Sequence, residues 1–301
     1  MSRRVPLEGS FAAAEAAKMA DVDVVAAYPI TPQTHVIERM AEIINNGELK
    51  AAFIPVESEH SAMSACWGAS GAGARTFTAT ASQGFFLMHE VLYIAASNRC
   101  PIVMSLVNRA LSGNINIHCD HSDAMLARDS GWIQLWCENA QEAYDSMIQE
   151  VRIAEHKDVR LPVMVTTDGF IISHGMERID TLPDADVQSF IGKYDPMMHL
   201  LDVKKPFTIG AINLTDYYFE HRRAMVDAQN NALKVIKEVG SEFGKKFDTS
   251  YGLIEKYQLD DAEVAIVALG STCGTAKVVI DKLRQQGVKA GLLKSPELEE
   301  P

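Results

Sequence analysis

Two carboxylates, Glu57 and Glu59, lie within the densest run of small residues in the chain, FIPVESEHSAMSACWGASGAGARTFTATASQG at 53–84. The short apolar run Phe53–Val56 suits the carboxyl end of a buried parallel strand, which is the edge where α/β sheets place their ligand sites. Almost every residue of Ser61–Gly73 is small, so a helix there can lie close to its neighbours and leave room for a flat ligand. We therefore interpret this stretch as the floor of a catalytic site, with the two carboxylates at its centre.

Thr31 is a candidate for contact with a substrate oxygen. It belongs to the segment YPITP at 28–32, which follows an apolar strand pattern at 22–27. The two prolines restrict the backbone, so the hydroxyl is held with little conformational freedom, as substrate contact requires. A second interpretation is equally open, because Thr31 precedes a proline that can begin the helix 33–45 and can therefore cap that helix.

Arg109 directly follows the carboxyl end of another buried strand pattern, PIVMSLV at 101–107. A guanidinium at the lip of a buried sheet needs an anion, and it can hold a planar carboxylate by two parallel hydrogen bonds. This position predicts binding of an acidic substrate. A structural salt bridge with one of the nearby aspartates is the alternative.

The loop between Ala110 and Gly131 has about 20 residues without clear periodicity, and such a loop inside a compact domain is more often functional than idle. It carries the polar cluster His118, Cys119, Asp120, His121 and Asp123. These residue types are ligands for zinc or iron, but ligands at successive positions cannot all face one ion. We therefore favour a lid that organises Arg109, and we predict no metal site in this chain.

The order of strand and helix patterns predicts the fold class. Apolar or β-branched runs predict strands at 22–27, 53–56, 76–81, 101–107, 132–137 and 162–168. Helical patterns alternate with them at 12–20, 33–45, 61–73, 85–97 and 140–156. The alternation predicts an α/β protein whose residues 1–175 form a domain with a doubly wound parallel sheet.

The remainder of the chain is expected to be organised differently. Residues 176–261 are predicted to form a linker, made of an extended arm over 176–219 and a long charged helix over 216–246. The segment Gly240–Lys245 resembles a phosphate loop, but its glycine spacing is one residue short and no Ser or Thr follows the lysine, so we discard that match. Residues 262–301 begin a second α/β domain. One strand-helix-strand unit cannot bury a core of its own, so this domain is either cut short or completed by another chain.

Composition narrows the partners of the protein. The 301 residues carry a formal net charge of −12 and are 47% apolar, which disfavours nucleic acid or an anionic membrane as a partner. No segment approaches the roughly 20 apolar residues of a membrane helix, and the amino terminus lacks an apolar leader core. We expect a cytoplasmic protein. The five cysteines form no C-x-x-C pair, so neither a zinc ribbon nor an iron–sulfur cluster can be built from this chain alone.

Several motifs occur together in one order: YPITP at 28–32, SEHSAM at 58–63, TATASQG at 78–84 and NRALSGNINIHCDHSDAMLARDSGW at 108–132. In these motifs the chain resembles the alpha subunit of pyruvate:ferredoxin oxidoreductase and related 2-oxoacid oxidoreductases, over about residues 9–175, more loosely over 193–219 and again from 262. These enzymes depend on thiamine diphosphate. The resemblance implies a pyrimidine-type thiamine diphosphate domain for residues 1–175 and a partial second domain of the transketolase C-terminal type.

The resemblance also implies roles for individual residues. Glu59 falls on the glutamate that hydrogen-bonds the pyrimidine ring of the cofactor, and Glu57 is then structural. Arg109 falls on the position that binds the carboxylate of the 2-oxoacid, next to the substrate-contacting Thr31. The other residues expected to line the site are Tyr28, Pro29, Ser82 and Gln83 for the cofactor and Asn114 for the substrate. Relatives often carry Ala-Pro or a bulkier pair at Gly113-Asn114, so the size of the substrate stays open.

The expected reaction is oxidative decarboxylation of a 2-oxoacid, pyruvate first, to acyl-CoA and carbon dioxide, with coenzyme A as a substrate. The chain lacks a Gly-Asp-Gly motif followed by Asn, so we expect a beta-type subunit to hold Mg²⁺ and the diphosphate. Gamma- and delta-type subunits are expected to carry [4Fe–4S] clusters and to pass electrons to ferredoxin or a similar acceptor. The enzyme is expected to be a dimer of hetero-oligomers, active only with its partners.

The same residues are compatible with other functions. An aryl or branched-chain 2-oxoacid such as phenylglyoxylate would use the same chemistry. A transketolase-like enzyme would keep Glu59 but needs several basic residues at the mouth of the site, where only Arg109 and Arg128 are evident. A non-catalytic scaffold needs none of Thr31, Glu59 and Arg109.

Overall fold

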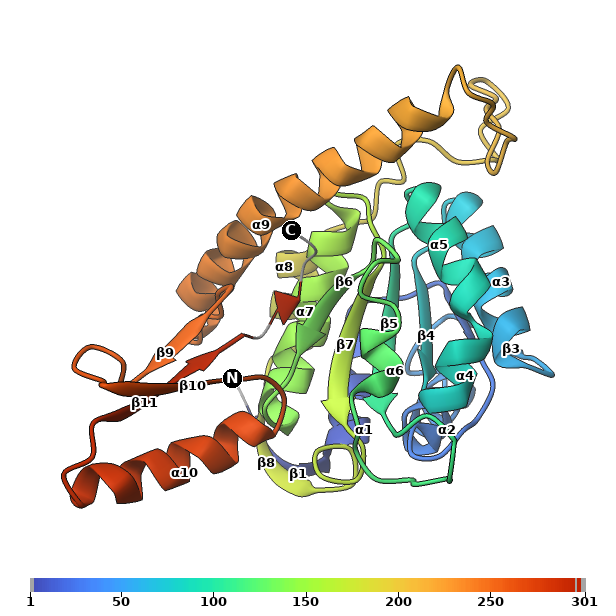
Figure 1. Cartoon of the computed structure of the whole chain (residues 1–301). Coiled ribbons are helices and arrows are strands. Elements are labelled where there is room, and N and C mark those ends of the chain that lie inside the picture. The colour runs from blue at the N-terminus through green and yellow to red at the C-terminus, as the bar shows by residue number, and fades with distance from the viewer. Residues whose placement is uncertain (1–2, 296, 299–301) are drawn as a thin grey trace.

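The centre of the protein is one seven-stranded sheet (Figure 1). The structure, a computed structural model, describes residues 3–295 and 297–298. The strand order is β12-β6-β7-β5-β4-β2-β3, in which β12 is antiparallel to β6 and the other pairs are parallel. The strands are β2 (Val24–Ala27), β3 (Ala52–Pro55), β4 (Thr76–Thr80), β5 (Ile102–Asn108), β6 (Ile133–Trp136), β7 (Val163–Asp168) and β12 (Glu297–Leu298). The predicted α/β class with a doubly wound parallel sheet is confirmed.

Helices cover both faces of this sheet. The helix α1 packs against α2 and α7 on one face, and α3 packs against α4 and α5 on the other. These helices are α1 (Gly9–Met19), α2 (Thr34–Asn45), α3 (Glu59–Gly71), α4 (Ser82–Leu87), α5 (His89–Ser97) and α7 (Ala140–Glu155). The single helix expected over 85–97 is instead divided into α4 and α5. The buried alanines of α1 have small side chains, so α1 and α7 can pack closely.

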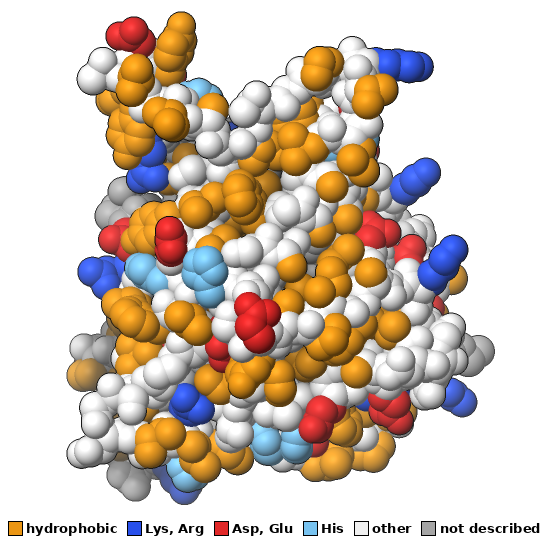
Figure 2. Space-filling view, turned by 90° about the vertical axis from the view of Figure 1, so that its right-hand side faces the viewer, with side chains coloured by type: hydrophobic (Ala, Val, Ile, Leu, Met, Phe, Trp, Pro, Cys, Tyr) orange, Lys and Arg blue, Asp and Glu red, His pale blue; other side chains and the backbone are white. Residues whose placement is uncertain are grey.

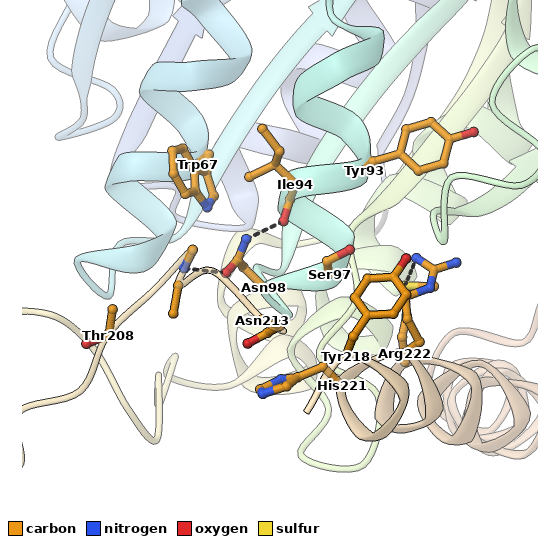
Figure 3. A pocket seen from close by; sticks show the side chains of 13 residues that line it. Trp67, Tyr93, Ile94, Ser97, Asn98, Thr208, Asn213, Tyr218, His221 and Arg222 are labelled. Atoms are coloured by element: carbon orange, nitrogen blue, oxygen red, sulfur yellow. Dashed lines mark hydrogen bonds between the residues drawn. The ribbon is translucent and has the colours of Figure 1, made fainter. Parts of the chain in front are cut away.

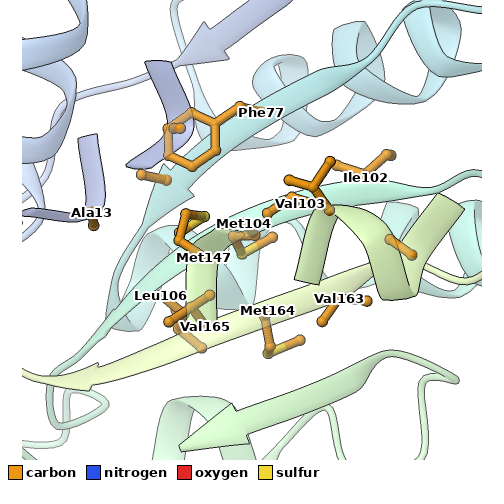
Figure 4. Packing of buried hydrophobic residues seen from close by; sticks show 14 of the residues in the cluster. Ala13, Phe77, Ile102, Val103, Met104, Leu106, Met147, Val163, Met164 and Val165 are labelled. Atoms are coloured by element: carbon orange, nitrogen blue, oxygen red, sulfur yellow. The ribbon is translucent and has the colours of Figure 1, made fainter. Parts of the chain in front are cut away.

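The core that fixes the sheet lies between its central strands and the helices (Figure 4). Phe77 of β4 and Met104 of β5 are fully buried, and Met147 of α7 packs into the same cluster. Each such side chain contributes about 1.5–3 kcal/mol by leaving water. Because β4, β5 and β7 are held by this core, the residues that follow their carboxyl ends start from fixed positions.

The segment after the first domain departs from the expected arm. Residues 176–191 form β8 (Met176–Thr181) and α8 (Asp184–Ile191), and β8 pairs in antiparallel fashion with β1 (Arg3–Glu8). Residues 192–217, called the arm below, contain no helix or strand. The arm runs over the ends of α3 and α5, because Leu200 N donates to Gly71 O at 2.9 Å and Gly210 N donates to Asn98 Oδ1 at 2.8 Å.

The predicted long helix is present as α9 (Tyr218–Phe247). It runs diagonally across the upper part of the molecule (Figure 1). Gly240 lies inside this helix, where a Cβ atom would lie 2.1 Å from Tyr251 O. The glycine is therefore explained by close packing of the returning chain, and the rejected phosphate-loop match has a structural explanation. Among the described residues, no helix combines the length and the apolar character needed to cross a membrane.

A small second unit follows α9. Its elements are β9 (Glu255–Tyr257), β10 (Val264–Ala268), α10 (Thr272–Gln285) and β11 (Ala290–Lys294), with the strand order β10-β11-β9. The predicted strand-helix-strand pattern is present, with β10 and β11 parallel, and β9 was not predicted. Val264 and Val267 of β10 are 62% and 69% exposed, so the described residues leave most of β10 uncovered. The division into domains at 1–175, 176–261 and 262–301 stays a prediction.

Candidate active site

The carboxyl ends of the parallel strands bring the predicted residues to one edge of the sheet. Thr31 follows β2, Glu59 follows β3, Ser82 follows β4 and Arg109 follows β5. The strands β3, β2, β4 and β5 are consecutive neighbours in the sheet. Residues that are up to 78 positions apart in the sequence therefore meet at this edge, as Arg109 and Thr31 do.

Glu59 is a buried carboxylate without a donor. It is the first residue of α3, whose N-cap Ser58 accepts a hydrogen bond from Ser61 N, and its side chain is 6% exposed. No described residue donates a hydrogen bond to its carboxylate or pairs with it as an ion. A Cβ atom on Gly84 would lie 2.5 Å from Glu59 Oε1 and 2.6 Å from Thr80 Oγ1, and Thr80 Oγ1 is itself buried without a partner among the described residues. Glycine at position 84 therefore lets the Glu59 carboxylate and the Thr80 hydroxyl pack directly against the backbone of α4, where any side chain would collide with both groups.

Glu57 has a different environment. Its side chain is exposed and accepts a hydrogen bond from Ser61 Oγ, which lowers the pKa of the Glu57 carboxyl. Ser61 lies in the first turn of α3, so this bond supports the start of that helix. The contrast favours Glu59 as the ligand-binding carboxylate and a structural role for Glu57.

The Arg109 guanidinium contacts neutral acceptors. Its Nη1 donates to Thr31 O at 2.7 Å and its Nη2 donates to Gln83 Oε1 at 2.8 Å, while Nε is buried without a partner among the described residues. Burial lowers the pKa of Arg109, and the charges of Asp123 and Glu59 oppose that shift. No described carboxylate forms a salt bridge with this guanidinium, so the structural ion pair is not found. The remaining N–H groups are suited to an anionic ligand.

Thr31 lies in a turn that Gln33 holds. The fully buried Gln33 amide accepts from Ile30 N at 3.1 Å and donates to Ala79 O of β4 at 2.7 Å. The Thr31-Pro32 peptide bond is cis, and Thr31 is exposed at the carboxyl edge. The capping interpretation of Thr31 is wrong, because α2 begins at Thr34 and its N-cap residue is Gln33. Gln33 was not identified from the sequence.

The other predicted lining residues divide into two groups. Ser82 is fully buried with its Oγ 2.6 Å from Ala110 O, and Gln83 contacts Arg109, so both belong to the cluster. Tyr28 and Pro29 are exposed at the end of β2, in the segment that leads to Thr31. Asn114 is exposed in the loop, and no described hydrogen bond links it to Arg109 or Thr31. The structure therefore does not bring Asn114 into the cluster.

The polar cluster of the loop does not converge on one point. Asp123 faces inward toward Arg109 N at 3.0 Å, Asp120 accepts from Ser122 N at 2.7 Å, and the His118 ring lies 5.3 Å from the ring of Phe170. The loop therefore organises Arg109, as the sequence suggested, through Asp123 and the short helix α6 (Ser122–Met125).

A smaller group gathers Cys119, His121 and Asp168, whose ligand atoms lie within 4.8 Å of one another. Both oxygens of Asp168 already accept hydrogen bonds, from His121 Nε2 at 2.7 Å and from Ser271 N at 2.9 Å. Burial raises the pKa of the Cys119 thiol and the Asp168 charge raises it further, so this sulfur stays protonated. These contacts join the loop to the start of α10.

A cavity of about 410 Å³ lies apart from the carboxyl edge (Figure 3). Trp67, Asn98, Tyr218 and Arg222 line it, from α3, the end of α5 and the start of α9. None of the predicted site residues lines this cavity. Figure 2 shows the face that α3, α4 and α5 cover, where apolar side chains are spread up to the arm at the top. Phe86 of α4 is 56% exposed and Ile212 of the arm is 90% exposed.

The cluster fits the ring end of thiamine diphosphate. The buried Glu59 carboxylate and the adjacent buried Thr80 hydroxyl, which have no hydrogen-bond partner among the described residues, match the nitrogen atoms of a flat ring. The Arg109 fork and the Thr31 hydroxyl lie beside this place and match a small carboxylate.

Two family models match the chain. The model described as pyruvate flavodoxin/ferredoxin oxidoreductase, thiamine diphosphate-binding, matches residues 15–241. The model of pyruvate:ferredoxin oxidoreductase core domain II matches residues 262–298.

Several relatives are similar over nearly the whole chain. The pyruvate synthase subunit PorA of Thermotoga maritima is 56% identical, with 97% of this chain and 74% of the relative covered. The PorA subunit of Methanocaldococcus jannaschii is 55% identical, with 96% and 75% covered. The ketoisovalerate oxidoreductase subunit VorA of Pyrococcus abyssi is 46% identical, with 96% and 73% covered. The chain thus spans about three quarters of the length of these relatives.

One solved structure has the same fold over nearly the whole chain. It is a 2-oxoglutarate:ferredoxin oxidoreductase from Magnetococcus marinus with 2-oxoglutarate, coenzyme A and succinyl-CoA bound. Its TM-score is 0.79 at 21% identity, and the match covers 97% of this chain and 54% of the other. At this identity the similarity concerns the fold alone.

Proposed function

The chain belongs to the pyruvate flavodoxin/ferredoxin oxidoreductase family, and from this premise we propose that it is the alpha-type subunit of a thiamine diphosphate-dependent enzyme that oxidises pyruvate. The reaction joins the acetyl group to coenzyme A, releases carbon dioxide and passes the electrons to ferredoxin or a similar acceptor. The buried Glu59 carboxylate, without a donor and beside Gly84, is the observation that carries this proposal.

Glu59 would hold the pyrimidine ring of the cofactor. Its carboxyl group would donate a hydrogen bond to a ring nitrogen, which favours the imino tautomer of the ring, and the helix start at Ser58 fixes the place of Glu59. Ser82 and Gln83 would line the thiazolium side, and Tyr28 and Pro29 the outer wall. When bound, thiamine diphosphate supplies the nucleophilic carbon and the electron sink for decarboxylation.

Arg109 and Thr31 would bind the 2-oxoacid. The guanidinium donates to the substrate carboxylate through N–H groups that Thr31 O and Gln83 Oε1 leave free. The exposed Thr31 hydroxyl contacts the adjacent substrate oxygen. Binding the carboxylate here orients the 2-oxo carbon toward the cofactor, which is a proximity effect. Asn114 would approach the substrate only if its loop closes over the site.

Partner subunits would complete this site. A beta-type subunit would hold Mg²⁺ and the diphosphate, and gamma- and delta-type subunits would carry the [4Fe–4S] clusters, in a dimer of hetero-oligomers. Exposed apolar residues support such contacts, because monomeric proteins rarely expose large apolar areas. They occur on the arm at Leu201, Val203, Ile212 and Leu214 and on α4 at Phe86 and Leu87.

A branched-chain 2-oxoacid is the second candidate substrate. VorA of Pyrococcus abyssi is 46% identical to this chain, against 56% for PorA of Thermotoga maritima. Pyruvate is therefore the first choice. A panel of pyruvate, 2-oxoisovalerate and phenylglyoxylate, tested on the purified complex with coenzyme A and ferredoxin, separates these candidates by kcat/KM.

Calorimetric titration with thiamine diphosphate and Mg²⁺ tests the proposal. The chain alone is expected to bind the cofactor weakly, and the complex with its beta-type partner is expected to bind it tightly. Tight binding by the chain alone would refute the shared site. No binding by the complex would refute the proposed cofactor.

A further inference from the structure

The Asp123 carboxylate lies at the junction of the segments that carry Ser82 and Arg109. It is fully buried and accepts four hydrogen bonds. Its Oδ2 accepts from Ser82 N and from Arg109 N, both at 3.0 Å. Its Oδ1 accepts from Asn108 Nδ2 at 2.9 Å and from Ala124 N at 2.7 Å.

Only an ionised carboxylate meets all four donors. It offers about four lone-pair sites and no donor of its own. An asparagine at the same position would turn an NH₂ group toward two of these N–H groups and would leave them without an acceptor. Asp123 therefore holds the carboxyl ends of β4 and β5 together through charge-assisted bonds.

The hydrogen bond between Arg109 and Gln83 depends on the Asp123 carboxylate through the backbone on both sides. Arg109 Nη2 donates to Gln83 Oε1 at 2.8 Å. The backbone of Arg109 is bound to Asp123, and so is the backbone of Ser82, the residue before Gln83. Ser82 also has a φ of +47°, a left-handed conformation that non-glycine residues keep only when neighbouring contacts hold it. Asp123 supplies one of these contacts and Ala110 O supplies another, at 2.6 Å from Ser82 Oγ.

We propose that Asp123 is a positioning residue, which presets the Arg109 fork and the Ser82–Gln83 turn for the carboxylate of the 2-oxoacid. This role rests on the proposed function. Asp123 does not touch the substrate itself, because it is fully enclosed beneath Arg109. Its effect is transmitted through the direction of the guanidinium and through the charge that it places beside that group.

Asp123→Asn in the assembled enzyme tests this role. We expect KM for pyruvate to rise about tenfold or more, because N–H donors lose a charged acceptor, and kcat to change less. Asp120→Asn is the matched control on the same loop. Asp120 is exposed and its described hydrogen bonds are to Ser122 alone, including Ser122 N at 2.7 Å, a bond that asparagine can keep, so KM should stay unchanged.

A double-mutant cycle shows whether Asp123 acts through Arg109. In an Arg109→Lys background, Asp123→Asn should change KM by less than about twofold, since the fork that it positions is already lost. A full tenfold change in that background would overturn the proposal. An unchanged KM for Asp123→Asn in the wild-type background would overturn it as well.

Asn108→Ala is the alternative test of this role if the Asp123→Asn variant does not assemble with the partner subunits. It removes one of the four donors, and the Asn108 Oδ1 atom is already buried without a partner among the described residues, so the truncation is mild. KM should rise about two- to threefold, as for one weakened hydrogen bond, and an unchanged KM contradicts the role. The wild-type complex is measured first. If the wild-type complex turns over no 2-oxoacid, the proposed function is wrong. If it does turn over a 2-oxoacid, the variants test the role of Asp123 alone.

Discussion

Two buried groups of charges in this protein are built in opposite ways. The first, called the lock below, joins the second unit to the first domain. Lys294 is 2% exposed and contacts Glu138 at 2.8 Å, Glu255 at 3.2 Å and Glu142. Lys277 contacts Glu138 at 2.8 Å and Glu255 at 2.7 Å. The second group is the site, where no described residue donates to Glu59 and the described hydrogen bonds of the Arg109 guanidinium go to neutral oxygens.

The difference separates a structural role from a binding role. In the lock, burial disfavours the charge of Lys294, yet the Glu142 and Glu138 carboxylates outweigh this effect and raise the pKa of Lys294. Each charge there is met by charges of the same chain. In the site, a buried carboxylate and a buried guanidinium keep unused hydrogen-bonding capacity, which is costly unless a ligand uses it. Substituting a charged group that keeps unused hydrogen-bonding capacity, as in the site, should mainly lower turnover. Substituting a charged group that is paired within the chain, as in the lock, should mainly lower stability.

Glu59→Gln should have the largest effect. We expect kcat to fall about 10²–10⁴-fold in the assembled enzyme, because the carboxylate that shares a proton with the cofactor is lost. The melting temperature should stay within about 2 °C, since no described residue depends on this carboxylate. Glu57→Gln, two positions earlier and exposed, is the control and should keep nearly full activity. Equal activity of the two variants would remove Glu59 from the account.

Lys294→Met should be the most damaging change to stability. It leaves the largely buried Glu142 carboxylate without its cation and Glu138 with Lys277 alone, and breaking such a buried pair costs about 3–5 kcal/mol in the free energy of unfolding. Urea denaturation of the chain measures this loss. Lys289→Met is the control, because Lys289 pairs with Glu263 at 2.9 Å on the surface and such pairs contribute about 0–1 kcal/mol. Equal urea midpoints for the two variants would contradict the distinction between buried ion pairs and surface ion pairs.

Arg109→Lys should raise KM for pyruvate about 10- to 100-fold, because an ammonium cannot reproduce the planar fork. Steady-state kinetics of the assembled complex checks this value. Arg128→Lys is the control, since Arg128 is exposed and bonds only Met125 O. If KM is insensitive to Arg109→Lys, the substrate carboxylate is bound elsewhere.

Asp145 is intermediate between the two groups, because its carboxyl is buried without a described cation but accepts hydrogen bonds from the chain. It is 3% exposed, it accepts from Tyr251 Oη at 2.6 Å, and burial raises its pKa from 3.8 to about 6. Because the folded chain favours the protonated form, this contribution to stability is fully present below pH 3.8 and is lost as the pH rises through about 6.

Asp145→Asn should therefore stabilise the chain by up to about 3 kcal/mol at pH 8 and by almost nothing at pH 4. Urea midpoints at the two pH values measure the difference. Asp158→Asn, an exposed change, should show no such pH dependence. A gain that is the same at pH 4 and pH 8 would show that the charge of Asp145 is not its cause.

The residues that follow strands could be predicted from the sequence. Glu59, Thr31 and Arg109 each lie within a few residues after an apolar run, and parallel strands bring such positions to one edge. The resemblance to the family then distinguished Glu59 from Glu57. The roles that Thr31, Arg109 and Asn114 play toward a ligand stay predictions, because they depend on contacts with molecules outside this chain.

The residues that hold the site were harder to predict. Gln33 donates a hydrogen bond to Ala79 O, and Asp123 accepts one from Ser82 N, which lies 41 positions earlier. Neither partner follows from local spacing, because hydrogen bonds across a sheet edge depend on the tertiary fold. The pairing of Arg3 with Thr181 was not predicted, for the same reason. The arm was expected from residue 176, but β8 and α8 occupy its first part, where short elements have too few residues to show a period.

A density map of the assembled complex with thiamine diphosphate and Mg²⁺ tests the central claim most directly. We expect the pyrimidine ring beside Glu59, with a ring nitrogen about 2.7–3.0 Å from a Glu59 carboxyl oxygen and the diphosphate in the partner subunit. A cofactor bound away from Glu59, or a diphosphate held by this chain, would refute the shared site.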